Sequence, residues 1–150
     1  MDIHRFDTKE RSSQAVVFGE LVFVAGQVAR DRAGAEIGEQ TREALARIDA
    51  LLARAGSDKS RLLNATIWLR RAADSRAMND AWVAWLPRGT GPAHAVIEGG
   101  MMADGWDVEI TVIAAVHQIP NLHDPAGNTS TTHKGTSSKD SGSESSWRAL

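Results

Sequence analysis

The sequence predicts an α+β domain in which two helices pack on one face of a mixed β-sheet. Three features carry this prediction. Apolar residues recur at helical spacing between residues 37 and 55, and an aliphatic stripe occupies every second position between 108 and 116. Strand-like and helix-like segments also interleave along the chain, with both helices after the first three strands. The pattern indicates one domain whose sheet has a single face covered by helices.

The first half of the chain is expected to form three strands and a helix. A short strand near residues 3–6 precedes two β-prone segments, 15–18 and 21–25, which flank a Gly-Glu turn as in a hairpin. The helix follows over residues 37–55, because its apolar residues all fall on one face. Gly56 supplies a C-terminal cap for this helix.

The second half is expected to add a strand, a helix and two closing strands. The strand covers residues 62–69, and the helix runs over residues 75–86 until Pro87 stops it. The closing strands are predicted at 95–98 and 107–115, separated by glycine-containing turns. Met and Trp residues at helical spacing in the second helix are expected to pack on the sheet.

The sheet face opposite the helices is predicted to carry both carboxylates and large apolar residues. These residues are Glu98, Asp107 and Glu109, together with Phe23, Trp68 and Ile113. Such a mixed face is neither simply solvated nor uniformly apolar, so burial between subunits is the economical prediction.

Composition is that of an ordinary globular protein. The 150-residue chain is 42% hydrophobic and 24% charged with a formal net charge of −2, so its charge does not indicate nucleic acid or membrane as a partner. It has no cysteine, which excludes disulfides and thiolate chemistry. The histidines show no metal-ligand spacing, so we expect no metal site. The start of the chain lacks a signal-peptide pattern and no apolar run has membrane-spanning length, which favours a cytoplasmic location.

Residues 1–118 are expected to form the domain, and residues 119–150 a low-complexity, disordered tail. Ser, Thr, Gly, Asp and Asn dominate most of this C-terminal segment. Such a composition buries too little apolar surface to offset the entropy lost on ordering.

Glu109 is the most prominent candidate for chemistry. The aliphatic stripe of its strand faces one side of the sheet, and alternation places the Glu109 side chain on the other. A carboxylate in that place is either solvated or part of a site, and the strand alone leaves both interpretations open. The pair Arg70-Arg71, at the end of an earlier strand, is interpreted as a solvated turn.

Several segments, in their order and spacing, resemble the reactive intermediate deaminase (Rid, YjgF-like) family from about residue 3 to residue 116. They are Val22–Gln27, the helix ending before Gly56, Asn64–Leu69 with Met78-Asn79, Pro92-Ala93-His94, and Val108-Glu109-Ile110. The resemblance implies a chorismate-mutase-like fold and a homotrimer with clefts between neighbouring subunits.

The resemblance also implies hydrolysis of a 2-imino acid, or its enamine tautomer, to a 2-keto acid and ammonia without a cofactor. Glu109 matches the family's glutamate, which orients the attacking water, and a carboxylate there can act as a general base. His94 occupies the position of the arginine that holds the substrate carboxylate. Arginine presents a charged fork to a carboxylate, whereas histidine offers at most one strong donor.

The same resemblance implies further substrate-binding positions. Asn79 matches the asparagine of the second helix, and Gly26 matches a glycine whose backbone lines the pocket. Ser12 and Ala25 stand where many members have tyrosine and serine, which implies a less hydroxylated pocket and an altered choice of substrate. Asn79 also has a purely structural interpretation, as a residue that braces its helix.

A second function from a different class stays open. The same clefts would suit a trimer that binds a small, carboxylate-bearing ligand, or interacts with another protein, without catalysing deamination. Retention of Glu109 favours the enzyme, and replacement of the arginine by His94 favours the binding protein.

Overall fold

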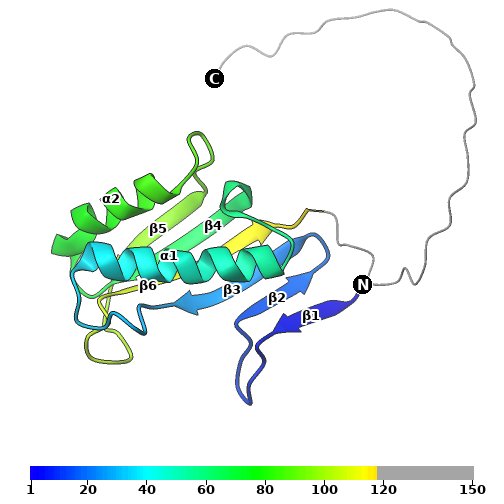
Figure 1. Cartoon of the computed structure of the whole chain (residues 1–150), viewed down its shortest axis with the longest axis horizontal. Helices are drawn as coiled ribbons and strands as arrows, with labels where there is room; N and C mark the ends of the chain where they lie inside the picture. The colour runs from blue at the N-terminus through cyan, green and yellow to red at the C-terminus, as the bar shows by residue number, and fades with distance from the viewer. Residues whose placement is uncertain (118–150) are drawn as a thin grey trace, which may run out of the picture. The chain divides into compact units, whose positions relative to one another are not determined.

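The computed structural model describes residues 1–117, whose strands form one six-stranded mixed sheet (Figure 1). The strands are β1 (Ile3–Phe6), β2 (Ala15–Phe18), β3 (Leu21–Gln27), β4 (Leu62–Leu69), β5 (Ala93–Glu98) and β6 (Val108–Ala115). Their order is β1-β2-β3-β6-β4-β5, with β4 and β5 parallel and the other neighbours antiparallel. The expected tail at residues 119–150 lies outside the described residues.

Helices α1 (Ile37–Arg54) and α2 (Ser75–Trp85) lie side by side on one face of the sheet (Figure 1). This arrangement confirms the predicted α+β class, with two helices on one face of a mixed sheet. Two short 3-10 turns, Lys59–Arg61 and Ala72–Asp74, lead into β4 and α2.

The C-terminus of α1 shows how local sequence ends a helix. Gly56 has φ +75°, the left-handed conformation that glycine adopts without steric cost. This turn lets the Ser57 amide donate to the Leu52 carbonyl at 2.8 Å and the Gly56 amide to the Ala53 carbonyl at 3.2 Å. The predicted cap is confirmed, and the helix ends at Arg54, one residue earlier than expected.

Two strands are longer than their local sequence predicts. β3 continues to Gln27, two residues past the expected end, and β5 begins at Ala93 rather than at residue 95. Pairing partners explain the second difference, since β5 runs parallel to β4 from the Ala93–Asn64 pair onward. Pairing between β4 and β5 therefore determines where β5 begins.

The core lies between the helices and one face of the sheet. Alternate residues of β6 form its centre, and α1 contributes a matching apolar stripe. The fully buried members of largest volume include Leu45, Ile48, Leu52, Ile67, Leu69, Met78 and Ile110. The aliphatic stripe of β6 is thus the buried face, as predicted.

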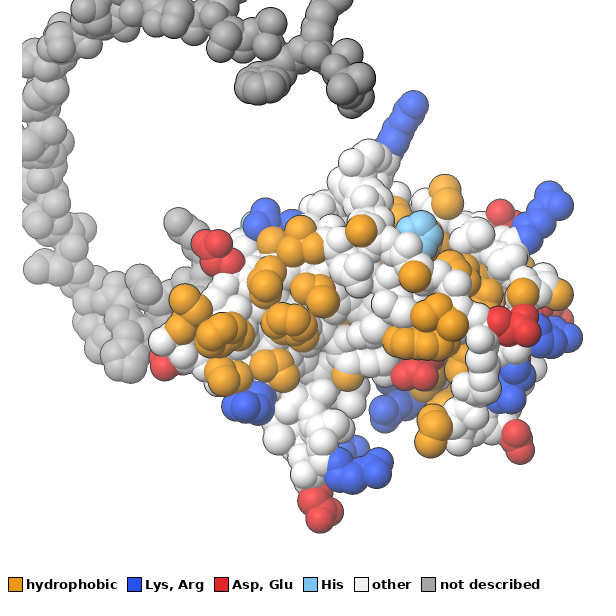
Figure 2. Space-filling model, turned by 180° about the vertical axis from the view of Figure 1, so that it is seen from behind, with side chains coloured by type: hydrophobic (Ala, Val, Ile, Leu, Met, Phe, Trp, Pro, Cys, Tyr) orange, Lys and Arg blue, Asp and Glu red, His pale blue; other side chains and the backbone are white. Residues whose placement is uncertain are grey.

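The opposite face, here called the open face, carries exposed apolar side chains. Figure 2 views the molecule from this side and shows hydrophobic side chains gathered on it. Phe18, Phe23 and Ile97 are among them, each with more than two-fifths of its surface exposed. Trp68 and Ile113 lie on the same face by register, opposite Glu109 and Phe23 respectively.

Two of the carboxylates predicted on the open face lie elsewhere. Glu98 pairs in register with the buried Leu69, which places it on the helix side, where its carboxylate accepts a hydrogen bond from the Ala72 amide at 2.6 Å. Asp107 lies just before β6, and its carboxylate bonds to Gln40 of α1 and to Arg70. Glu109 is therefore the one carboxylate of the predicted three that belongs to the open face.

Within residues 1–117, the longer helices are too short or too polar to cross a bilayer. The same residues bring together no group of three or more histidine, aspartate or glutamate side chains suited to hold a metal ion.

The end of β6 is fastened to the turn that follows α1. Asp58 accepts hydrogen bonds from the Ser60 hydroxyl and from the His117 ring, the latter at 2.8 Å. Arg61 also donates to the Ala115 and Val116 carbonyls. The Ser60 hydroxyl, followed by the His117 contact, lowers the pKa of Asp58 from 3.8 to about 2.

We expect Asp58, with its partners Ser60 and His117, to make the free energy of unfolding depend on pH under acid conditions. Because the folded pKa lies below the unfolded value, the carboxylate contributes stability above about pH 4, which is lost as pH falls through about 2. The contribution should stay under about 1 kcal/mol, since the Asp58 side chain is half exposed and solvent screens the pair. Denaturant titrations from pH 5 to about 2 should show the wild type converging on Asp58→Asn. If the difference in free energy of unfolding between the wild type and Asp58→Asn did not change with pH, this expectation would be contradicted.

Candidate functional site

Glu109 lies on the open face near the middle of the sheet. β6 is flanked by β3 and β4, and Glu109 stands directly opposite Trp68 of β4. Its side chain is partly buried, so the carboxylate is reachable from solvent but shielded on its flanks. A carboxylate in these surroundings has the access to water that general-base chemistry needs.

A β-bulge in β3 shapes the space beside Glu109. Val24 pairs with Val112 and Gln27 with Ile110, so Ala25 and Gly26 together oppose the single residue Thr111. The Thr111 hydroxyl donates to the Val24 carbonyl, which fastens the bulge to β6.

Gly26 of this bulge lies directly against the Glu109 side chain. A Cβ atom at position 26 would overlap Glu109 Oε1, and would lie 2.8 Å from Cδ and 3.0 Å from Cγ. Glycine is therefore required for the Glu109 carboxylate to keep its position. The structure thus brings together two of the predicted site residues, Gly26 and Glu109, with Ala25 next to them in the bulge.

His94 lies in a different place, on the helix side of the edge strand β5. It pairs with Ala65, which is buried beneath the helices, and its ring centroid is 6.1 Å from that of Trp82 in α2. His94 and Asn79 line an open pocket of about 570 Å³ between α2, the following turn and the start of β5. We call this the α2–β5 pocket.

The predicted site residues therefore form two separate groups within one chain. Glu109 and Gly26 lie on the open face, whereas His94 and Asn79 lie on the helix side of β5. Ser12 belongs to neither group, since it lies exposed in the loop between β1 and β2. A cleft containing both Glu109 and His94 therefore requires more than the surface of one chain.

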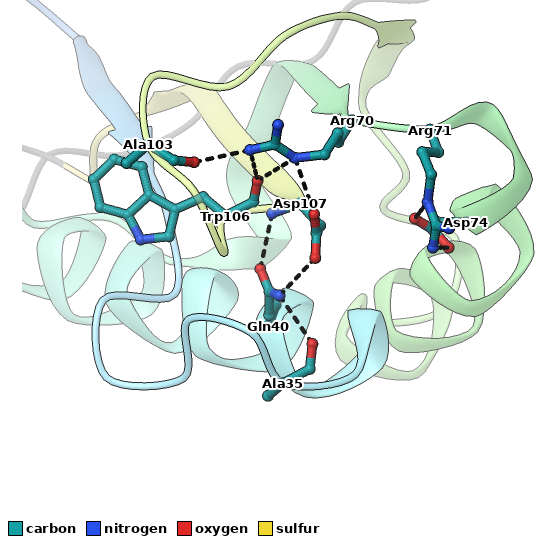
Figure 3. A network of polar contacts seen from close by, with 8 residues as sticks. All are labelled: Ala35, Gln40, Arg70, Arg71, Asp74, Ala103, Trp106 and Asp107. Atoms are coloured by element: carbon teal, nitrogen blue, oxygen red, sulfur yellow. Dashed lines mark hydrogen bonds and ion pairs between the residues drawn. The ribbon is translucent and has the colours of Figure 1, made fainter.

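A partly buried polar network beneath the start of β6 is not evident from the sequence (Figure 3). Gln40 of α1 is fully buried; its amide donates to the Ala35 carbonyl and to Asp107 Oδ2, while its oxygen accepts from the Asp107 amide. Arg70 bonds to Asp107 Oδ1 and to the carbonyls of Ala103 and Trp106. The network holds the loop before β6, two residues upstream of Glu109.

The predicted solvated turn at Arg70-Arg71 is half correct. Arg71 is exposed and pairs with Asp74, three residues away. Arg70 is two-thirds buried, and its guanidinium is committed to the network of Figure 3. The sequence carries one signal for this role, an arginine that directly follows an apolar strand, but its partners come from residues more than thirty positions away.

The fold belongs to a known class of small α+β domains. A crystal structure of NMB1025, described as a member of the YjgF protein family from Neisseria meningitidis, matches with a TM-score of 0.76 and 39% identity, over 79% of this chain and 98% of that one. Residues 2–116 match the model of the family described as endoribonuclease L-PSP, and the chain belongs to this family.

Named relatives agree with this assignment. The RutC family protein YoaB of Escherichia coli K12 is 39% identical over 116 residues, which cover 77% of this chain and all of that protein. A goat protein named 2-iminobutanoate/2-iminopropanoate deaminase is 30% identical over 107 residues, covering 68% of this chain and 77% of its own. The resemblance to the Rid and YjgF family is thereby confirmed.

Proposed function

We propose that this protein is a homotrimeric deaminase that hydrolyses a small reactive imine or enamine of the 2-imino acid type. The observation that carries the proposal is the Glu109 carboxylate held against Gly26 on an otherwise largely apolar sheet face. A deaminase of the goat with 30% identity supports the choice of reaction. A cytoplasmic location accords with a small metabolic substrate.

The trimer is proposed for two reasons. One chain leaves the apolar side chains of its open face exposed, and it does not bring the predicted site residues together. Phe18, Phe23 and Ile97 remain exposed, and contact between copies would bury them. Glu109 and His94 lie on opposite faces of one sheet, so a single small ligand would reach both most directly across two neighbouring subunits.

In the proposed reaction, water adds to the carbon of the C=N bond. Glu109 accepts a proton from this water as the C–O bond forms, and delivers it to the nitrogen, giving an amino alcohol. Glu109 then takes the hydroxyl proton and passes it to the same nitrogen. The C–N bond breaks, ammonia leaves, and the oxygen remains as the carbonyl of the keto acid.

The experiment measures ammonia release from freshly generated 2-iminopropanoate, with Glu109→Gln as the test variant. The amide keeps the shape of the side chain and loses the base, so turnover should fall to the level of the uncatalysed reaction. Light scattering on the same samples should report three chains for both proteins. Unchanged turnover in Glu109→Gln would show that another group activates water, and a monomer would contradict the proposed site.

The alternative is a trimer that binds a ligand without catalysis. The observation that favours it is His94, which lacks the charged fork of an arginine at the position that would hold the carboxylate. Absence of ammonia release from an intact wild-type trimer would favour this alternative. A third activity, cleavage of RNA, is named in the description of the family model, but the net charge of −2 does not support RNA binding.

A further inference from the structure

The α2–β5 pocket has the size of a small-molecule site and walls of two kinds. Its volume of about 570 Å³ lies within the range of ligand-binding cavities. Val83, Leu86 and Pro87 form an apolar part, and Trp82 presents its ring toward that of His94, tilted by 36°. An aromatic or branched aliphatic group would bury its surface against these side chains.

Each polar side chain that lines the pocket carries at least one N–H group able to donate a hydrogen bond. Asn79, Arg88 and His94 line it, and no aspartate or glutamate does. Arg88 carries a permanent positive charge, and residues 1–117 supply it with no ion-pair partner. A cation next to an apolar wall, without a neighbouring carboxylate, suits a ligand that joins an anion to an apolar body.

The backbone holds Arg88 at the rim of the pocket. Pro87, Arg88, Gly89 and Thr90 form a turn in which the Thr90 amide donates to the Pro87 carbonyl at 3.2 Å, and the Thr90 hydroxyl donates to the same oxygen at 2.7 Å. Gly89 has φ +80°, as the third residue of a type II turn requires. Arg88 is the second residue, so its backbone is fixed although its side chain is exposed.

We infer that Arg88 is the anion-binding residue of the α2–β5 pocket, and that the pocket takes a carboxylate attached to an aromatic or branched aliphatic group. The inference names the substrate class of the proposed deaminase, and for turnover it rests on that proposed function. The permanent charge that an arginine at position 94 would provide is supplied here from the turn that precedes β5, so selectivity for carboxylates resides in Arg88.

Calorimetry with 3-phenylpropanoate tests the inference on the full chain. 3-Phenylpropanamide is the uncharged counterpart, and propanoate lacks the aromatic body. Wild type should bind 3-phenylpropanoate at least about tenfold more tightly than it binds the amide or propanoate. The amide lacks the negative charge for Arg88, and propanoate lacks the ring that packs on the apolar wall. The indole N–H resonance of Trp82 should shift on binding, which places the probe in this pocket.

Arg88→Gln is the test variant and Arg76→Gln the matched control, since Arg76 is exposed on α2 and does not line the pocket. We expect Arg88→Gln to weaken binding of 3-phenylpropanoate by about tenfold or more while binding of the amide stays the same. Arg76→Gln should behave as wild type. Equal binding of acid and amide, unchanged affinity in Arg88→Gln, or no binding at millimolar probe would each overturn the inference.

The two proposals fail in different ways. Calorimetry needs no turnover, so carboxylate binding that depends on Arg88 would support this inference even if the wild type released no ammonia. Suppose instead that ammonia release depends on Glu109 but that Arg88→Gln binds the probe as tightly as the wild type. This result would overturn the inference and leave the proposed function standing.

Discussion

Gly26→Ala is expected to lower the turnover of 2-iminopropanoate by about 100-fold while leaving the fold intact. The new methyl group would overlap Glu109 Oε1, so the carboxylate must move by roughly an ångström, and a displacement of that size is typically costly for a reacting group. The loss should fall on kcat more than on KM, since Gly26 acts here through the general base. Stability should change little, because the displaced atoms are the end of a partly exposed side chain.

Gly100→Ala is the matched control for this variant. A Cβ at position 100 meets no atom within 4 Å, and the residue has no positive φ that would strain an alanine. Its turnover should equal that of the wild type. If Gly26→Ala retained full activity while Glu109→Gln lost it, the position set by the bulge would be irrelevant to the chemistry.

Gln40→Leu is expected to lower the free energy of unfolding by about 3 kcal/mol. Gln40 is fully buried and makes three hydrogen bonds, to the Ala35 carbonyl, the Asp107 carboxylate and the Asp107 amide. Leucine fills a similar volume but deprives these partly buried groups of their hydrogen bonds to Gln40. Urea denaturation followed by circular dichroism measures the change.

Glu39→Leu serves as the control for Gln40→Leu. Glu39 precedes Gln40 in α1, and its side chain is exposed in a surface ion pair with Arg32. Removing such a pair typically changes stability by less than about 1 kcal/mol. Equal effects of the two substitutions would show that the network of Figure 3 contributes nothing beyond the loss of a polar residue in the first turns of α1.

Short-range patterns in the sequence were sufficient to predict both helices, the six strands apart from some of their ends, and the layer arrangement. The apolar stripe of α1, its Gly56 cap and the alternation in β6 each depend on residues within a few positions of one another. Alternation also placed Glu109 on the face opposite the aliphatic stripe, and the structure confirms that position. Periodicity of this kind indicates which side of a helix or strand is buried.

The tertiary structure alone decided which segments share a face and where the site residues meet. Glu98 and His94 lie on the helix side because β5 pairs with β4 in a register that no local pattern specifies. Gly26 reaches Glu109 through a bulge that exists only where β3 and β6 pair. Arg70 and Gln40 both contact Asp107 across more than thirty intervening residues. Register, bulges and buried polar contacts depend on pairing between distant segments, so only the folded chain determines them.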